Sequence, residues 1–380
     1  MSGRDAVQVR GGAEARLVAD ACEAAWMPLR AAGAAGQTVV VFGSFDELLT
    51  VLRARPARTV WRPVGQRLPL PRGAAWALRR VDVVVAPDVL LARSVGSVPT
   101  VVIPTAVARD HDIDDIDDID ASRAHEGLRI LVVLEALDHA AGAALTVLAA
   151  LAHGLVETCA ACGCDAPLTF SPLTARQVAA PACPCGGELV RQPALDLRAH
   201  VVLPDADDTP WAHEYVAGLR SWFDLEERVT IAEATDATEP LPAGFDLHLC
   251  AGGGAAVPRG VYVAAAAGLP TIMAGHGTIA DADAADVLGV RPCGYRTETI
   301  ADDTVRVHLD LAHACRSVLD LAADADERCR LGAAARAASA DHDIERLVPA
   351  WRRVLDRSTP AAAAHASNST RPLAPLGGGR

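Results

Sequence analysis

The sequence predicts an α/β protein of two Rossmann-like lobes, with a small cysteine-rich insert in the second lobe. Short β-branched runs alternate with helical patterns along most of the chain, which is typical of parallel sheets. The length of 380 residues exceeds one ordinary core and suits two lobes of about 150 residues each plus a tail. An acidic segment separates the alternation into two series, which indicates a linker between the lobes.

The first series occupies residues 1–109. Gly11 and Gly12 precede a helical pattern over residues 13–27, in which apolar residues share one face. Strands are expected at 38–42, 59–61, 81–86 and 100–103, with helices after the first of these and near 88–95. Residues 110–126 follow, where the repeat Asp-Ile-Asp-Asp-Ile-Asp would repel itself in a packed core and therefore reads as the acidic linker.

The second series occupies residues 127–356. Strands are expected at 128–134, 199–203, 229–232, 246–250 and 271–274, and helices at 140–152, 211–222, 260–267, 305–321, 326–338 and 344–355. Residues 357–380 consist mainly of Ala, Pro, Ser and Gly with little to bury, so we expect a disordered tail.

The composition excludes several classes of protein. The net charge of −13 argues against a specific nucleic-acid binder, because phosphate neutralisation needs a surplus of cations. The chain contains no Lys, which excludes a Schiff-base lysine and a Walker A motif. The beginning of the chain is polar and no apolar run is long enough to span a membrane, so a cytoplasmic protein is expected.

The order of the elements resembles that of family 4 glycosyltransferases, which have the GT-B fold. Gly11-Gly12-Ala13-Glu14 is similar to the Gly-Gly-Ala-Glu turn of that family, and Val102-Ile103-Pro104-Thr105-Ala106-Val107 to its end-of-lobe segment. Ala264-Ala265-Ala266-Ala267-Gly268-Leu269-Pro270-Thr271 resembles its Glu-Ala-Met-Ala-x-Gly-x-Pro segment. The likeness covers most of residues 10–356.

The resemblance implies a nucleotide-sugar donor held by the second lobe and an acceptor held by the first. An open parallel sheet binds ligands at the carboxyl ends of its strands, where helix N-termini offer N–H groups to a diphosphate. The candidate donor-binding residues are Gly11, Gly12, Gly253, Gly254, Arg259 and His276. A flexible loop beside a surface Arg, and a structurally satisfied His276, are the alternatives.

The sequence also departs from the family at the donor site. The two Glu that flank the family's glycine-rich loop correspond here to Ala255 and Val263. The family's Arg and Lys after the first strand of the second lobe are absent, and Glu135 and Asp138 occur in that segment instead. No catalytic residue can be assigned from spacing.

A cysteine cluster is the sharpest local signal. Cys159 and Cys162, with Cys183 and Cys185, form two knuckles that would supply four thiolates to a structural zinc ion. The second knuckle is one residue shorter than usual, so Cys164 is a candidate substitute ligand. We expect a zinc-ribbon-like insert at 157–190, against the alternative of buried or redox-active thiols, and such an insert suits docking to a protein partner.

Eight Arg and no acid occur between residues 53 and 80, with two Trp among them. Such a patch would suit a phosphorylated acceptor or peripheral contact with an anionic membrane, against the alternative of an ordinary solvated face. Arg62 and Arg67 are the first candidates for acceptor or anion binding.

Two functions follow from these observations. The first is a glycosyltransferase that moves a sugar from a nucleotide-sugar donor to an unknown acceptor. The alternative is a catalytically inactive GT-B-fold interaction protein, which would bind a partner through the zinc insert and the Arg-rich face. A sugar-nucleotide epimerase would need acids and a His that the spacing does not identify.

Overall fold

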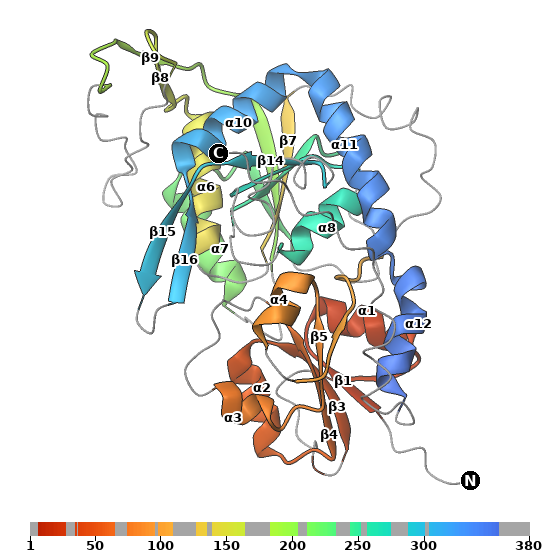
Figure 1. Cartoon of the computed structure of the whole chain (residues 1–380). Coiled ribbons are helices and arrows are strands. Elements are labelled where there is room, and N and C mark those ends of the chain that lie inside the picture. The colour runs from red at the N-terminus through yellow and green to blue at the C-terminus, as the bar shows by residue number, and fades with distance from the viewer. Residues whose placement is uncertain are drawn as a thin grey trace, which may run out of the picture.

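A computed structural model describes residues 7–27, 35, 37–64, 74–95, 98–108, 127–134, 139–163, 183–203, 211–232, 244–251, 257–274, 288–300 and 304–356. These residues form two lobes, each built on a six-stranded parallel sheet (Figure 1). The predicted α/β class with two Rossmann-like lobes is confirmed. The expected linker at 110–126 and tail at 357–380 lie outside the described residues.

The first sheet has the strand order β2-β1-β3-β4-β5-β6. Its strands are β1 (Val7–Arg10), β2 (Ala25–Met27), β3 (Thr38–Gly43), β4 (Arg58–Pro63), β5 (Val83–Ala86) and β6 (Thr100–Val102). Its helices are α1 (Ala13–Ala21), α2 (Phe45–Arg53), α3 (Ala74–Leu78) and α4 (Val89–Ser94). The helix expected over 13–27 ends early because Glu23 adopts a φ of 56°, and the chain then continues as β2.

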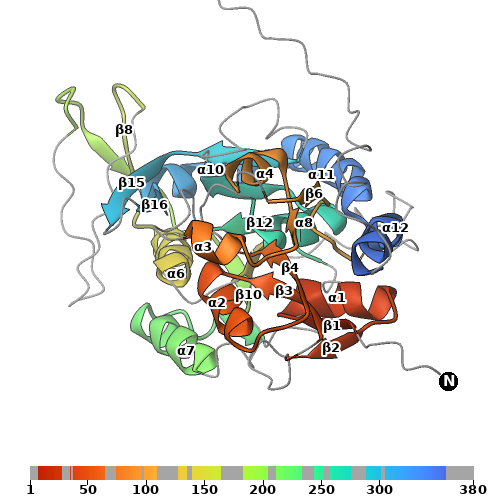
Figure 2. The same cartoon turned by 60° about the horizontal axis from the view of Figure 1, so that its bottom comes forward.

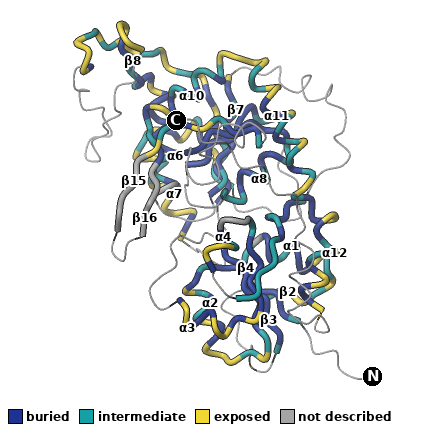
Figure 3. Tube along the Cα trace, in the orientation of Figure 1, coloured by how far each residue is buried: buried dark blue, intermediate teal, exposed yellow. Residues whose placement is uncertain are grey.

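Helices cover both faces of the first sheet. One apolar core lies between the sheet and α1, together with the last helix of the chain, α12 (Ile344–Leu355). A second core lies beneath α2 and α3 on the opposite face, as Figure 2 shows. Buried positions therefore follow the strands through the middle of the lobe (Figure 3).

The second sheet has the strand order β11-β10-β7-β12-β13-β14. Its strands are β7 (Leu128–Val133), β10 (Leu197–Val202), β11 (Val229–Ala232), β12 (Leu247–Cys250), β13 (Thr271–Ala274) and β14 (Val290–Cys293). Its helices are α6 (His139–Ala152), α7 (Ala212–Trp222), α8 (Arg259–Ala266), α10 (Leu311–Ala323) and α11 (Ala325–Ser339). In chain order this is the Rossmann arrangement, whose strand order reverses between β7 and β12.

Two antiparallel hairpins extend from the second lobe. β8 (Glu157–Cys159) pairs with β9 (Leu189–Arg191) in the cysteine-rich insert, and β15 (Tyr295–Ile300) pairs with β16 (Thr304–Leu309). The prediction of a helix over 305–321 was wrong for its first turns, because residues 304–309 form β16 and α10 begins at Leu311. Thr304–Leu309 alternates β-branched and polar residues, which suits a strand, and Asp310 caps α10 by accepting a hydrogen bond from the His313 N–H.

The chain crosses back to the first lobe at its end. After α11, the 3-10 helix η3 (Ala340–His342) leads into α12, whose apolar face joins the core of the first lobe. Trp351 is fully buried there and stacks on Phe42, with ring centroids 5.1 Å apart. The last helix of the segment expected as the second lobe, 127–356, therefore packs in the first lobe. Within the described residues, no helix has the length and apolarity needed to cross a membrane.

Candidate functional site

The carboxyl ends of both sheets lie at the junction between the lobes. In the first lobe, Thr105 follows the carboxyl end of β6, and its carbonyl contacts the His342 ring that crosses back from the second lobe. In the second lobe, Tyr262 in the first turns of α8 stacks on the same ring, with centroids 4.0 Å apart. Parallel sheets bind ligands at this edge, so the junction is the place to seek a site.

Gly11 occupies the point in the first sheet where the strand order reverses. It follows β1 with a φ of +146°, a conformation that favours glycine. A Cβ there would lie 2.6 Å from both the Cβ and the carbonyl oxygen of Phe42 in β3. The predicted role of Gly11 and Gly12 in donor binding stays a prediction, while their position at this edge suits it.

A buried ion pair lies at the same edge of the first sheet, where its strands have their carboxyl ends. Nη2 of Arg62 in β4 lies 2.8 Å from Oε1 of Glu14 in α1, and its Nη1 donates to the Ile103 carbonyl at 2.6 Å. Glu14 also accepts the Ala106 N–H at 3.0 Å. Arg62 is only 1% exposed, so it lies outside any exposed anion-binding face, contrary to the expectation for the Arg-rich segment.

His342 couples the two lobes. Its Nδ1 lies 3.0 Å from the Thr105 carbonyl and therefore carries the proton. Desolvation by burial lowers the pKa of His342, and its hydrogen bond to Thr105 opposes that shift. The backbone beside it is also fixed, because Val107 and Asp343 form a parallel bridge.

The start of α8 lies over the end of β7 in the second sheet. Its N-cap, Pro258, makes no side-chain capping hydrogen bond, and half-buried Arg259 is the first helical residue. A Cβ on Gly260 would lie 2.9 Å from the Cβ of Val133, so glycine allows the helix to pack directly on the strand. Gly260 was not among the predicted site residues, although it ends the glycine-rich loop that drew attention to Arg259.

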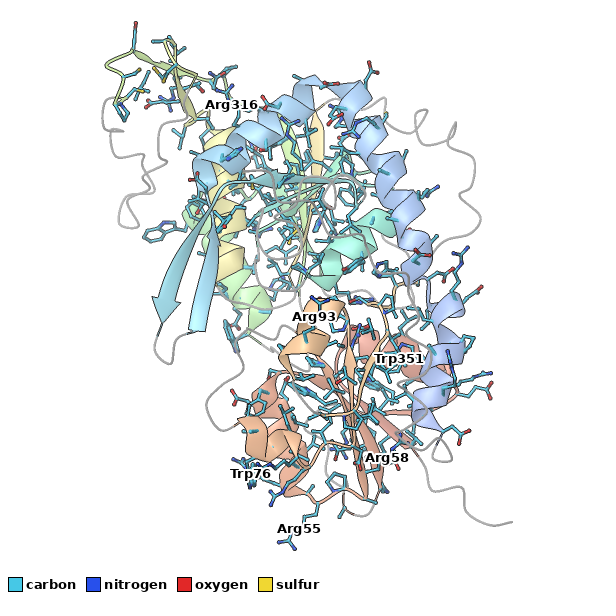
Figure 4. The ribbon with its side chains drawn as sticks, in the orientation of Figure 1. Arg55, Arg58, Trp76, Arg93, Arg316 and Trp351 are labelled. Atoms are coloured by element: carbon cyan, nitrogen blue, oxygen red, sulfur yellow. The ribbon has the colours of Figure 1, made fainter. Side chains whose placement is uncertain are left out.

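Several predicted residues lie outside the described part of the chain. These are Gly253, Gly254, His276, Arg67 and Cys164, together with Ala255, Glu135 and Asp138. Val263, at the position of the family's second Glu, is a half-buried residue of α8. A cation that the sequence did not single out is Arg93 of α4, an exposed residue at the junction side of the first lobe in Figure 4.

Four cysteines converge at the loop end of the β8–β9 hairpin. The sulfur atoms of Cys159, Cys162, Cys183 and Cys185 all lie within 4.8 Å of one another. The closest pairs are 3.3 and 3.4 Å apart, against about 3.8 Å for thiolates that surround zinc tetrahedrally at 2.3 Å. The predicted cluster is therefore confirmed as a group that could hold a metal ion.

Two turns with different lengths present these thiols. Gly163 N–H donates to the Cys159 carbonyl four residues back, whereas Gly186 N–H donates to the Cys183 carbonyl three residues back. Both glycines have positive φ, at +70° and +78°. The shorter second knuckle thus closes with a tighter turn and still places Cys185 in the cluster.

The backbone favours thiolates at this position. The pKa of Cys159 is lowered to about 6, first because the Cys162 backbone N–H donates to its sulfur. Backbone N–H groups also act to lower the pKa of Cys183 and Cys185, but hydrogen bonds with the neighbouring thiols outweigh them and raise both pKa values. Gly187 N–H lies 3.3 Å from the Cys185 sulfur, and a Cβ on Gly187 would lie 2.6 Å from the Cys159 sulfur. Arg316 of α10 donates to the Gly163 carbonyl at 3.3 Å and ties the cluster to the lobe.

The chain is similar in fold to solved glycosyltransferases. A glycosyltransferase from Rickettsia africae ESF-5 is 10% identical, with a TM-score of 0.51, over 94% of this chain and 100% of that one. WaaG, a glycosyltransferase of lipopolysaccharide biosynthesis, is 11% identical, with a TM-score of 0.52, over 92% and 100%. HepE from Anabaena, in complex with UDP and glucose, is 13% identical, with a TM-score of 0.51, over 93% and 99%. No family model and no curated protein matches the chain.

Proposed function

We propose that the chain is a glycosyltransferase that takes a sugar from a nucleotide-sugar donor held by the second lobe. The observation that carries this proposal is the start of α8, which reaches the lobe junction with Arg259 in its first turn and no side-chain N-cap. The fold is that of GT-B glycosyltransferases, one of which was crystallised with UDP and glucose. The acceptor would lie against the first lobe, with Gly11 and Gly12 beside the bound donor.

The chemistry of a diphosphate suits this helix start. The first turn of a helix carries the positive end of the helix dipole, which attracts anions. Arg259 adds a cation at the same place, and a charged hydrogen bond contributes about 1.5–3 kcal/mol. Gly260 brings the first turn onto Val133, so a donor there would also contact the end of β7.

The alternative is an interaction protein built on a disused transferase fold. Val263 supports this alternative, because its apolar side chain cannot accept the ribose hydroxyl bond that the resemblance assigns to a Glu. A GT-B chain that has lost donor contacts would keep its two lobes and its cysteine insert. Its partner would then bind the insert or the Arg-rich end of the first lobe.

The two functions differ in whether sugar is released from a donor. The full chain is incubated with a panel of UDP- and GDP-sugars, with and without Mg²⁺, and the free nucleotide that forms when water takes the sugar in place of the acceptor is measured over time. Release from one donor that falls at least tenfold in Arg259→Ala, but is retained in the exposed control Arg346→Ala, supports the transferase. Absence of release from every donor supports the interaction protein.

We also propose that the four clustered cysteines hold a structural zinc ion. Soft thiolate ligands in a tetrahedral set favour zinc, and four protein ligands leave no open position for catalysis. The N–H groups that face the sulfurs would stabilise the thiolates. The ion would fix the β8–β9 hairpin, whose few residues bury little apolar surface of their own.

A further inference from the structure

The Arg-rich segment forms a cationic surface at one end of the first lobe. α2 ends at Arg53 and is followed by Arg55, and α3 is followed by Arg79 and Arg80. These four side chains are exposed, and Trp76 of α3 is 55% exposed. We call this set, Arg53, Arg55, Trp76, Arg79 and Arg80, the basic end.

Topology places the basic end away from the lobe junction. Each of these residues lies where a helix returns to the beginning of a strand, α2 before β4 and α3 before β5. In a parallel sheet such connections share the edge opposite to the carboxyl ends. Figure 4 shows Arg55, Arg58 and Trp76 at the end of the first lobe that is far from the second.

The four arginines of the basic end form no ion pair in the part of the chain that the structure describes. Asp82 is the nearest acid along the chain, and one of its carboxylate oxygens accepts the Thr59 N–H at 2.7 Å. A surplus of positive charge on one end is notable in a chain with a net charge of −13.

Trp76 and Arg80 distinguish the kind of partner. The Arg80 guanidinium lies 3.9 Å from the centroid of the Trp76 ring, so the two side chains present an apolar ring and a cation together. Trp favours the interface between lipid and water, and neighbouring arginines are attracted to anionic headgroups. A nucleic acid longer than the basic end would extend past it and be repelled by the acidic remainder of the protein. A flat bilayer surface would contact the basic end alone.

We propose that the basic end docks the protein on an anionic membrane surface. Trp76 would enter the headgroup layer, and Arg53, Arg55, Arg79 and Arg80 would contact lipid phosphates. The lobe junction would then face away from the bilayer surface, open to the aqueous phase. This inference does not depend on the proposed transferase activity.

Sedimentation of the full chain with vesicles tests the proposal. We expect binding to phosphatidylcholine vesicles that contain phosphatidylglycerol, little binding to phosphatidylcholine alone, and loss of binding at high salt. Arg79→Gln with Arg80→Gln should weaken the affinity about 25-fold, since each arginine near an anionic surface contributes about fivefold. The matched control Arg346→Gln with Arg353→Gln removes the same charge from α12 and should retain the affinity.

Trp76 supplies a second, local readout. The fluorescence of Trp76 is obtained by subtracting the emission spectrum of Trp76→Phe from that of the wild type. This emission should shift to the blue with anionic vesicles and be quenched by brominated lipid. Absence of binding, equal binding to neutral vesicles, or equal weakening by the control pair would overturn the proposal. So would tighter binding to an RNA oligonucleotide than to the anionic vesicles at the same ionic strength.

Discussion

Arg62 and Glu14 form an ion pair inside the first lobe, with Nη2 and Oε1 2.8 Å apart and side chains only 1% and 7% exposed. The pair joins β4 to the start of α1, and through the Ala106 N–H and the Ile103 carbonyl it also holds the segment that follows β6. That segment contacts His342 through Thr105. The pair therefore supports the place where the two lobes meet.

Removing one partner should destabilise the fold strongly. We expect Glu14→Gln to lower the free energy of unfolding by about 3–5 kcal/mol, because it leaves a buried guanidinium without its counter-charge. Chemical denaturation measures the loss. Adding Arg62→Met to Glu14→Gln should recover part of it, since the unpaired charge is then gone.

The exposed pair of Glu327 and Arg330 on α11, 2.7 Å apart, is the control. Glu327→Gln should change the free energy of unfolding by no more than about 1 kcal/mol, because solvent screens an exposed pair. Equal losses from Glu14→Gln and Glu327→Gln would contradict the structural role of the buried pair.

Gly260 should be intolerant of a methyl group. In Gly260→Ala the new Cβ would meet the Val133 Cβ at 2.9 Å, so α8 must shift, at a cost of about 1–3 kcal/mol in stability. Val133→Ala in the same chain should restore part of the stability. Denaturation curves and nucleotide titrations of the single and double variants measure both effects.

Gly218→Ala is the matched control within a helix. A Cβ there meets nothing within 4 Å, so the substitution should stabilise α7 by about 0.5–1 kcal/mol. If Gly260→Ala were equally stabilising, the close packing of α8 on β7 would be wrong.

The cysteine cluster should bind one zinc ion per chain. Protein purified with zinc should lose it when Cys159, Cys162, Cys183 or Cys185 is replaced by Ser, and should retain it in Cys329→Ser, a change at an exposed cysteine outside the cluster. Elemental analysis measures the metal, and hydrogen exchange of the β8–β9 hairpin measures its order. Retention in Cys185→Ser with loss in Cys164→Ser would make Cys164 the fourth ligand instead.

His248 should make the protein sensitive to acid. Complete burial in β12 lowers its pKa to about 3, whereas the unfolded chain binds the proton near the ordinary pKa of about 6.5. Above that ordinary pKa, His248 causes no change of the free energy of unfolding with pH. As pH falls from there toward 3, the unfolded chain takes up the proton and the free energy of unfolding decreases by about 1.4 kcal/mol per pH unit. Unfolding free energies of wild type and His248→Asn, measured from neutral pH to pH 4, should converge as pH falls. Parallel curves would show that His248 does not carry the effect.

The sequence was sufficient for the alternation of elements but not for partners across the fold. Apolar runs such as Thr38–Gly43 identify buried strands because their hydrophobicity is local. Nothing local shows that Arg62 faces Glu14, 48 residues away, so its place in an Arg-rich segment suggested an exposed face. Likewise, α12 has a clear helical pattern, whereas its return to the first lobe depends on the burial of Trp351 against Phe42.

The cysteine knuckles were predictable because ligand spacing is a local property. Gly163 and Gly186 each follow a cysteine at the position where the turn needs a positive φ. The hairpin of β15 and β16 was missed because its alternation is short and runs directly into α10. For Gly260, the only signal in the sequence was its place at the end of the glycine-rich loop. The requirement for glycine at this position comes from the contact with Val133, which the sequence does not show.

Calorimetric titration of the zinc-loaded full chain with UDP, GDP and their sugars is the decisive test of a donor site at the start of α8. We expect one nucleotide to bind with measurable heat, and Arg259→Ala to weaken its affinity at least tenfold, as for the loss of a charged hydrogen bond of about 1.5–3 kcal/mol. Arg346→Ala should bind as the wild type does. Absence of binding by every nucleotide, or equal affinity in Arg259→Ala, would contradict a donor site at the start of α8.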